Sequence, residues 1–367
     1  MYPSKIVLLA KNLSTALFIT LFFISISGST IAQVNTIRGE VFASKDNEPL
    51  AGVNVYISGT SIGSSTDSNG KFEFETSLKG KFDITASFLG FESQSKIVLL
   101  EEGKEYDFTF ILEETLLQLN EVQVSAERDK EWQELYADFR RFFIGWDTFS
   151  NEVQIENPES IDFERLGRTQ VIVSFREPIR IINYSLGYYV TIEQQSIIFN
   201  PYDHSGFWNV YSRFEEIDPN PERSTRRKWK SNREKAYKGS SKHFFISLID
   251  ENLKNDKFVV LPYSDVIEKV EKEELIRRQF PGQWELIRDN FNVFRVENIN
   301  FGVAFDPDYK RSGEIASHVE LSSFRVNNSL GLIIVDDYGS IFNTKEVVFF
   351  GPWSEDRFAK TLPLDYK

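Results

Sequence analysis

The 367-residue chain contains no cysteine and only three histidines, His204, His243 and His318. Without cysteine there is no disulfide framework, no thiol nucleophile and no thiolate metal site. The histidines do not occur in the paired spacing that zinc hydrolases use, so the sequence predicts neither a metal site nor a cofactor. Stability must come from an apolar core, for which 33 phenylalanines, 14 tyrosines and 6 tryptophans supply the material.

Positive charge is also scarce. Lysine and arginine together number 42 against 55 aspartates and glutamates, which gives a formal net charge of −13. A chain of this acidity is a poor candidate for binding nucleic acid, because the phosphate backbone would repel it. We therefore expect no nucleic-acid partner.

The first 32 residues differ from the rest. Lys5 and Lys11 accompany an apolar run at residues 16–26, and small residues lead to Ala32. This layout predicts a secretory signal peptide, residues 1–32, cleaved after Ala32. The run is shorter than the ~20 residues that a spanning helix needs. We expect an exported protein with a mature charge of −15, no transmembrane helix after cleavage and, since no cysteine follows Ala32, no lipid anchor.

Residues 34–113 alternate apolar and polar side chains. Val53, Val55 and Ile57 would share one face of a strand, and Phe72 and Phe74 repeat the pattern. Gly and Asn interrupt the runs at turns such as Asn69–Gly70, a pair that suits a tight hairpin. With no helical period, these strands must bury their faces against one another, which predicts an all-β sandwich of about seven strands in two sheets.

This segment resembles the carboxypeptidase-regulatory-like domain, a transthyretin-like (prealbumin-like) module common in envelope proteins of Bacteroidetes. The matching positions are Gly39, Val41, residues 49–53 (PLAGV), Gly59, Thr60, Gly63, Thr66, Asp67, residues 69–72 (NGKF) and residues 88–91 (FLGF). The resemblance implies a sandwich that is accessory to other domains, located in the periplasm or at the outer membrane. In carboxypeptidases the zinc site belongs to a separate domain, which this chain lacks.

Two motifs inside the sandwich imitate functional sites. Residues 59–63 fit G-x-S-x-G, but that nucleophile motif needs a strand-to-helix elbow, whereas strands flank Ser61 on both sides. Residues 67–70 resemble the start of a calcium loop, but Gly70 comes too early for one. We interpret both as loops between strands and predict no catalytic residue.

Residues 114–126 form a linker, and residues 120–126 alternate as an edge strand or a docking strand would. The segment resembles the connector that follows the same domain in TonB-dependent receptors. Only 241 residues remain after it, too few for the plug and pore of such a receptor. The transporter hypothesis is therefore rejected.

Residues 127–367 predict an α+β domain with a mainly antiparallel sheet. Trp132, Phe139 and Phe143 recur at helical spacing, and a second helix is expected at residues 240–253 with Ser240 or Ser241 as its cap. Strands are expected at residues 171–175, 188–192, 197–199, 258–261, 291–296, 330–335 and 347–350. This part resembles an uncharacterised second domain of Bacteroidetes envelope proteins, through motifs such as residues 142–145 (FFIG) and 362–366 (LPLDY).

A basic and aromatic run at residues 223–242 stands out in an acidic chain. We predict that it receives an anionic partner, such as lipid headgroup phosphates or an acidic glycan. The predicted binding residues are Arg226, Arg227, Lys228, Trp229, Lys230, Arg233 and Tyr237. The alternative is a solvated loop that leads into a helix, with His243 as a structural residue.

Paired acids occur at residues 215–216, 273–274 and 336–337. Neighbouring side chains on a strand point to opposite faces, so such pairs cannot act as catalytic dyads. We expect Asp337 to open a turn over residues 337–340. A glycosidase pair would have to come from separate strands.

Together these patterns favour a non-enzymatic, exported envelope protein that acts by binding or scaffolding, with an envelope protein or an outer-membrane component as partner. Two alternatives remain. One is a hydrolase of envelope glycans or peptides with an unrecognised carboxylate site. The other is an accessory to TonB-dependent uptake that docks through residues 119–126.

Overall fold

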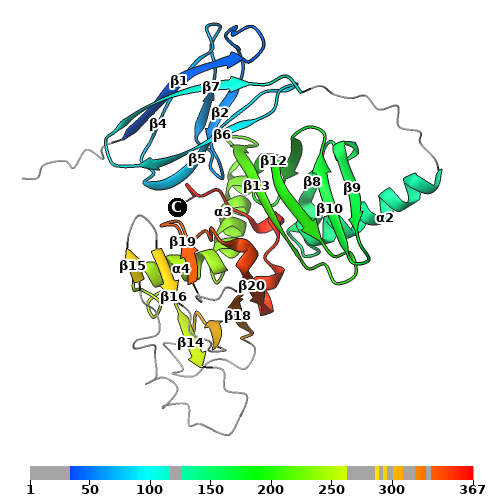
Figure 1. Ribbon diagram of the computed structural model, residues 1–367. Coiled ribbons are helices and arrows are strands. Elements are labelled where there is room, and N and C mark those ends of the chain that lie inside the picture. Colours follow the sequence, from blue (N-terminus) through cyan, green and yellow to red (C-terminus); the bar gives the residue numbers. More distant parts are fainter. Residues whose placement is uncertain are drawn as a thin grey trace, which may run out of the picture.

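In the computed structural model of the protein, the described residues are 34–115, 126–262, 286–288, 292–295, 301–308, 319–327 and 332–366. They form an N-terminal β-sandwich and a larger α+β part, with helix α3 (Arg223–Tyr237) near their junction (Figure 1). The predicted signal peptide, most of the predicted linker and the acid pair at 273–274 lie outside the described residues.

Seven strands form the sandwich within residues 34–115, which confirms the predicted all-β module. They are β1 (Asn35–Ala43), β2 (Asn54–Ile57), β3 (Gly63–Ser65), β4 (Lys71–Thr76), β5 (Gly80–Ser87), β6 (Gln94–Leu100) and β7 (Glu105–Leu112). One sheet has the order β4-β1-β7 and the other β3-β2-β5-β6. The predicted inward positions Val53, Val55, Ile57 and Phe72 are buried between the sheets.

Strands β1 and β7 run parallel, with Gly39 opposite Phe108. A Cβ at Gly39 would lie 1.9 Å from the Phe108 carbonyl oxygen, so only glycine permits this close approach. Gly39, one of the positions at which the chain resembles the regulatory-like domain, is thus explained by the close packing of β1 against β7.

A six-stranded antiparallel sheet opens the second part. Its strands are β8 (Val153–Ile155), β9 (Ile161–Leu166), β10 (Gln170–Phe175), β11 (Ile179–Asn183), β12 (Tyr188–Phe199) and β13 (Gly206–Glu216), in the order β8-β11-β12-β10-β9 with β13 on the other edge of β12. Helix α2 (Ala126–Phe143) buries Phe139, Phe142 and Phe143 in the core of this sheet. The predicted aromatic helix is therefore confirmed.

The remaining described elements surround a second core that contains Phe244, Phe245 and Trp353. Strands β14 (Phe258–Pro262), β17 (Phe301–Phe305), β18 (Leu321–Val326) and β20 (Val347–Phe350) form an antiparallel sheet, and β15 (Leu286–Arg288), β16 (Asn292–Arg295) and β19 (Leu332–Val335) form another. The helices are α4 (Ser241–Ile249) and the short turns η1 (Ser150–Glu152), η2 (Pro158–Ser160), η3 (Thr344–Glu346), η4 (Gly351–Glu355) and η5 (Phe358–Lys360).

Helix α4 begins where the sequence predicts, because the Ser240 side chain accepts a hydrogen bond from His243 N. It ends at Ile249, four residues earlier than expected. Two larger corrections concern β13, which sequence periodicity missed, and residues 223–237, which form α3 instead of a loop. The expected strands at 188–192 and 197–199 join into β12, with an irregularity near residues 194–196.

The sandwich joins the second part by strand addition. Gly59 N donates to Ser212 O (2.7 Å), Phe214 N donates to Thr60 O (3.0 Å), and Leu364 N donates to Gly59 O (2.8 Å). The loop between β2 and β3 is therefore held between β13 and the C-terminal segment. Ser61 donates its hydroxyl to Asp365 (2.5 Å). The G-x-S-x-G segment is a loop between strands, as predicted, and its serine has a structural contact.

A carboxylate lies buried at this junction. Glu193 on β12 is 6% exposed and accepts a hydrogen bond from the Tyr56 hydroxyl of the sandwich (3.1 Å). Burial raises the pKa of Glu193 above its usual value, while hydrogen bonds from Ser87, Ser93 and Tyr56 and the charge of Arg213 act in the opposite direction. The junction therefore favours the protonated acid.

Exchanging Glu193 for glutamine removes this ionisation. In the wild type, the unfolded chain loses the proton near pH 4.5 while the folded protein retains it to higher pH, so stability falls as pH rises through that interval. We expect the stability of E193Q relative to the wild type to increase as the pH rises above about 4.5, because glutamine has no proton to lose. Urea denaturation at an acidic and at a neutral pH measures the free energy of unfolding of both proteins, with the exposed Glu164→Gln as control. If the difference in the free energy of unfolding between E193Q and the wild type does not change with pH, the prediction is wrong.

Candidate functional site

All seven predicted binding residues lie on α3. Its Arg, Lys and Glu side chains are good helix formers, but with only Trp229 and Ala236 buried they provide little apolar periodicity. The charged composition explains why the segment resembles a solvated loop in the sequence. Tertiary contacts at Trp229 and its neighbours hold the helix in place.

Three side chains of α3 attach it to the turn between β11 and β12. Trp229 Nε1 donates to Tyr184 O (3.0 Å), Asn232 Nδ2 donates to Ser185 O (2.9 Å), and Arg233 Nε donates to Leu186 O (2.8 Å). Three consecutive carbonyl groups are thereby satisfied by one helix face. We call these three hydrogen bonds the carbonyl clamp. They determine which side of α3 faces the solvent.

The inward residues of the predicted site have structural contacts. The Arg233 guanidinium lies 4.1 Å from the Tyr188 ring centroid and donates to Glu216 (2.9 Å). The Tyr237 ring lies 4.6 Å from the His243 ring. Trp229, Arg233 and Tyr237 therefore face the body of the protein, away from the exposed arginines.

The outward side carries Arg223, Arg226, Arg227 and Lys230, which we call the basic strip. Their spacing of three, four and seven residues places them along one side of the helix, and all four are exposed. Within the described part of the chain no ion pair joins them to an acid. Lys228, which lies beside the strip, is bound to Glu152 at 2.7 Å.

This charge arrangement opposes the helix that carries it. Like charges four residues apart repel, and cations near a helix N-terminus are unfavourable to the helix dipole. The first turn of α3 contains no acid, and its N-cap makes no side-chain hydrogen bond. The strip therefore costs stability and creates a local positive field on an acidic protein, which would attract an anionic surface.

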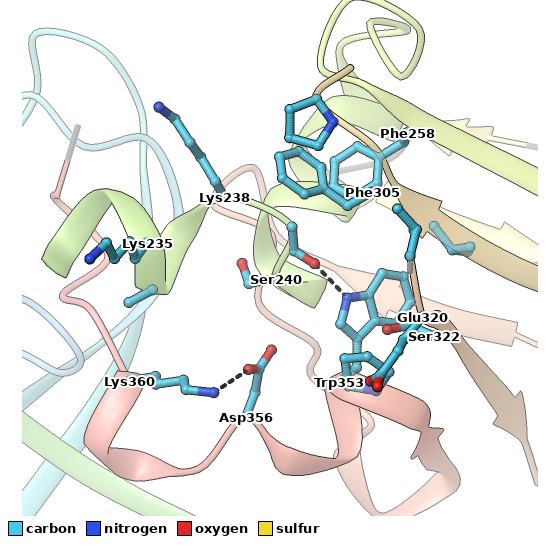
Figure 2. Close-up of a pocket in the computed structure, with 16 residues that line it drawn as sticks. Lys235, Lys238, Ser240, Phe258, Phe305, Glu320, Ser322, Trp353, Asp356 and Lys360 are labelled. Atoms are coloured by element: carbon cyan, nitrogen blue, oxygen red, sulfur yellow. Dashed lines mark hydrogen bonds and ion pairs between the residues drawn. The ribbon is translucent and has the colours of Figure 1, made fainter. Parts of the chain in front are cut away.

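A cavity of about 390 Å³ lies at the other end of α3 (Figure 2). Lys235, Lys238 and Lys360 lie on one side of it, and the rings of Phe258, Phe305 and Trp353 form the opposite wall. Asp356, Glu320, Ser240 and Ser322 contribute further polar groups. Sequence reasoning missed this site because its residues come from five separate segments.

Lys360 and Asp356 lie at the floor of the cavity, and Asp147 supports Lys360 from outside it. Lys360 Nζ lies 3.0 Å from Asp147 and 3.6 Å from Asp356. Burial raises the pKa of Asp356 to about 6, although the charge of Lys360 lowers it. Asp356 is thus an acceptor at neutral pH that can also take up a proton in mild acid.

Other candidate groups have structural roles. His243 Nδ1 accepts a hydrogen bond from Gly239 N (3.1 Å), and burial lowers its pKa, so the ring is neutral. Asp336, and not Asp337, opens the turn of the last acid pair, because its carboxylate accepts hydrogen bonds from Tyr338 N and Ser340 N. The predicted position of this turn was wrong by one residue. Within the described ranges no cluster of three metal-ligating side chains occurs.

A substitution at Gly187 tests whether α3 depends on its contact with the turn before β12. It has φ +78°, and a Cβ there would lie 2.3 Å from Trp229 Cδ2. We expect Gly187→Ala to lower the free energy of unfolding by about 2–4 kcal/mol through backbone strain and displacement of α3. Chemical denaturation measures the loss. Gly167→Ala is the matched control, because Gly167 has φ +71° with nothing within 4 Å of a Cβ. Equal losses in the two variants would show that α3 does not depend on this contact.

Comparisons with known proteins identify only the sandwich. Residues 37–124 match the family described as CarboxypepD_reg-like domain. A search of curated proteins finds no match. No helix among the described residues combines the length and apolarity needed to cross a membrane.

Solved structures give faint similarities. A type II cohesin–X-dockerin complex from Acetivibrio cellulolyticus is 22% identical over 21% of this chain and 56% of that chain, with a TM-score of 0.19. A minor pilin from Streptococcus agalactiae is 14% identical over 23% of this chain and 46% of that chain, with a TM-score of 0.20. Catechol 1,2-dioxygenase from Acinetobacter is 11% identical over 27% of this chain and 58% of that chain, also at 0.20. Scores this low carry no functional argument. The sequence match remains: residues 37–124 of this protein match the CarboxypepD_reg-like domain family.

Proposed function

We propose that this is an exported, non-enzymatic protein of the cell envelope that works by binding, and that its basic strip contacts an anionic lipid surface. Its place would be the periplasm or the periplasmic face of the outer membrane. The signal-like residues 1–32 and the non-catalytic sandwich support this proposal.

The observation that carries the proposal is the set of unpaired cations at Arg223, Arg226, Arg227 and Lys230. Elsewhere on the described surface, many cations have acidic partners, as Arg165 has Glu131 and Arg38 has Asp107. A net charge of −13 supplies ample acids, yet among the described residues none forms an ion pair with the strip. Because the strip weakens its own helix, an anionic partner is the compensation that we infer.

The shape of the strip favours a surface over a small ligand. It lies on the outer side of a helix and extends over eight residues, a rise of about 10 Å. Each cation near an anionic membrane contributes about 1 kcal/mol, so four contribute about 4 kcal/mol. That corresponds to weak, reversible attachment in the millimolar range. Repulsion between the acidic body and the membrane would orient the strip toward the lipid.

Charge reversal tests the strip. We expect R226E/R227E to bind vesicles of phosphatidylcholine with one-third phosphatidylglycerol more than tenfold more weakly than the wild type at low salt, because two attractive charges become repulsive. Co-sedimentation of the full exported chain measures the bound fraction. R168E/K254E reverses two exposed cations outside the strip and should bind like the wild type.

Three results would reject the lipid surface. The first is equal binding of the wild type to vesicles of phosphatidylcholine alone. The second is undiminished binding of R226E/R227E. The third is binding of the wild type to a sulfated glycan but to no vesicle, which would make a glycan the partner.

A further inference from the structure

The cavity at the end of α3 has the size of a ligand site. Its volume of about 390 Å³ falls within the range of small-molecule pockets, about 300–1,000 Å³. It lies between the end of α3, the start of α4, strands β17 and β18, and η4 (Figure 2). A smaller cavity of about 200 Å³ adjoins it and shares Ala236, Ser240, Asp356 and Lys360.

One wall presents a fixed aromatic ring. Phe258 and Trp353 are 3% and 4% exposed and belong to the core, whereas Phe305 is only partly buried. Gly239 lies directly behind Phe305, where a Cβ would come within 2.8 Å of the ring. The Phe258 ring lies 5.4 Å away and the His243 ring 5.8 Å away. Phe305 is therefore held in one orientation with part of its surface in the cavity.

The rest of the lining carries charges of both signs. Lys360 and Asp356 lie together at the floor, Lys235 and Lys238 lie on the side opposite the rings with their ammonium groups directed away from them, and Glu320 lies beside Trp353 (Figure 2). Lys360 is already shared between Asp147 and Asp356, and Lys238 lies 3.5 Å from Glu234. A strongly charged ligand would therefore gain little net attraction here.

Such a lining suits a neutral molecule with many hydroxyl groups. Each hydroxyl can donate to a carboxylate and accept from an ammonium group, and charged partners make these hydrogen bonds stronger than neutral ones. A sugar ring also has an apolar C–H face that can lie on an aromatic ring. Phe305 matches the C–H face of such a ligand, and Asp356, Lys360 and Glu320 match its hydroxyl groups.

We propose that this cavity binds a neutral pyranose unit, with its C–H face on Phe305 and its hydroxyls bonded to Asp356, Glu320 and Lys360. The site is separate from the basic strip and does not depend on it. The ligand class follows from the balanced charge and the accessible ring of Phe305.

Saturation-transfer NMR on the full exported chain tests the proposal with four probes, glucose, galactose, mannose and N-acetylglucosamine, each at about 10 mM. We expect at least one to bind in the millimolar range, with the strongest transfer to protons of one ring face. Phe305→Ala should weaken that probe at least tenfold. Glu320→Gln, an exposed conservative change, should weaken it two- to fivefold without affecting folding.

The matched aromatic control is Tyr202→Ala, which removes a ring that is 72% exposed and outside the cavity. It should bind the probe like the wild type. Vesicle binding by Glu320→Gln should also be unchanged, which separates this site from the strip.

Three results overturn the proposal. None of the four sugars binds the wild type; or the bound sugar is insensitive to both cavity variants; or glucuronate binds more than tenfold more tightly than glucose, which would make the site an anion site.

Discussion

The position of helix α3, and with it both candidate sites of this protein, depends on the carbonyl clamp. Trp229, Asn232 and Arg233 donate to three successive backbone carbonyls in the turn before β12. Since those carbonyls lie at the end of the six-stranded sheet, the orientation of α3 is tied to the sheet itself. The basic strip faces outward, and Lys235 and Lys238 reach the cavity, because the opposite side of the helix is held.

The clamp also holds a helix that its own charges disfavour, although it leaves the charge of the strip unpaired. Four like charges along one side and an uncapped N-terminus make α3 weak by itself. Hydrogen bonds to the carbonyls and the contact of Trp229 with Gly187 supply stability from the other side.

Hydrogen bonds to backbone groups also hold the junction between the sandwich and the second part. The loop after β2 has no partner within the sandwich for Gly59 N and Thr60 O, and β13 and the C-terminal segment provide them. Tyr56, on the outer face of β2, becomes buried because the second part covers it. Phe82 adds a ring contact with Tyr338 at 5.4 Å. The sandwich is thus built into the protein as a docked unit.

Local periodicity predicted the strands and helices correctly wherever one face of an element packs against a core. Val53, Val55 and Ile57 alternate and are buried, and Phe139 and Phe143 recur at helical spacing and pack under the sheet. Periodicity failed where burial is sparse or two-sided. Helix α3 buries only Trp229 and Ala236, so its polar sequence resembles a loop, and β13 is half-buried without a clear alternation.

The candidate site on α3 was also predictable only in part from the sequence. The basic run was visible in the sequence, because charge is a property of residues near one another along the chain. Its division into an outward strip and inward structural residues was not visible, because Trp229 and Arg233 are defined by contacts with residues about 45 positions away.

By itself, the sequence determined the sandwich, its similarity to the CarboxypepD_reg-like domain and the presence of a basic segment, since all three rest on local order. The tertiary structure alone decided which cations face solvent, why the G-x-S-x-G loop is a docking element, and that Phe305, Asp356 and Lys360 share a cavity. These depend on contacts between distant segments, which a one-dimensional pattern does not encode.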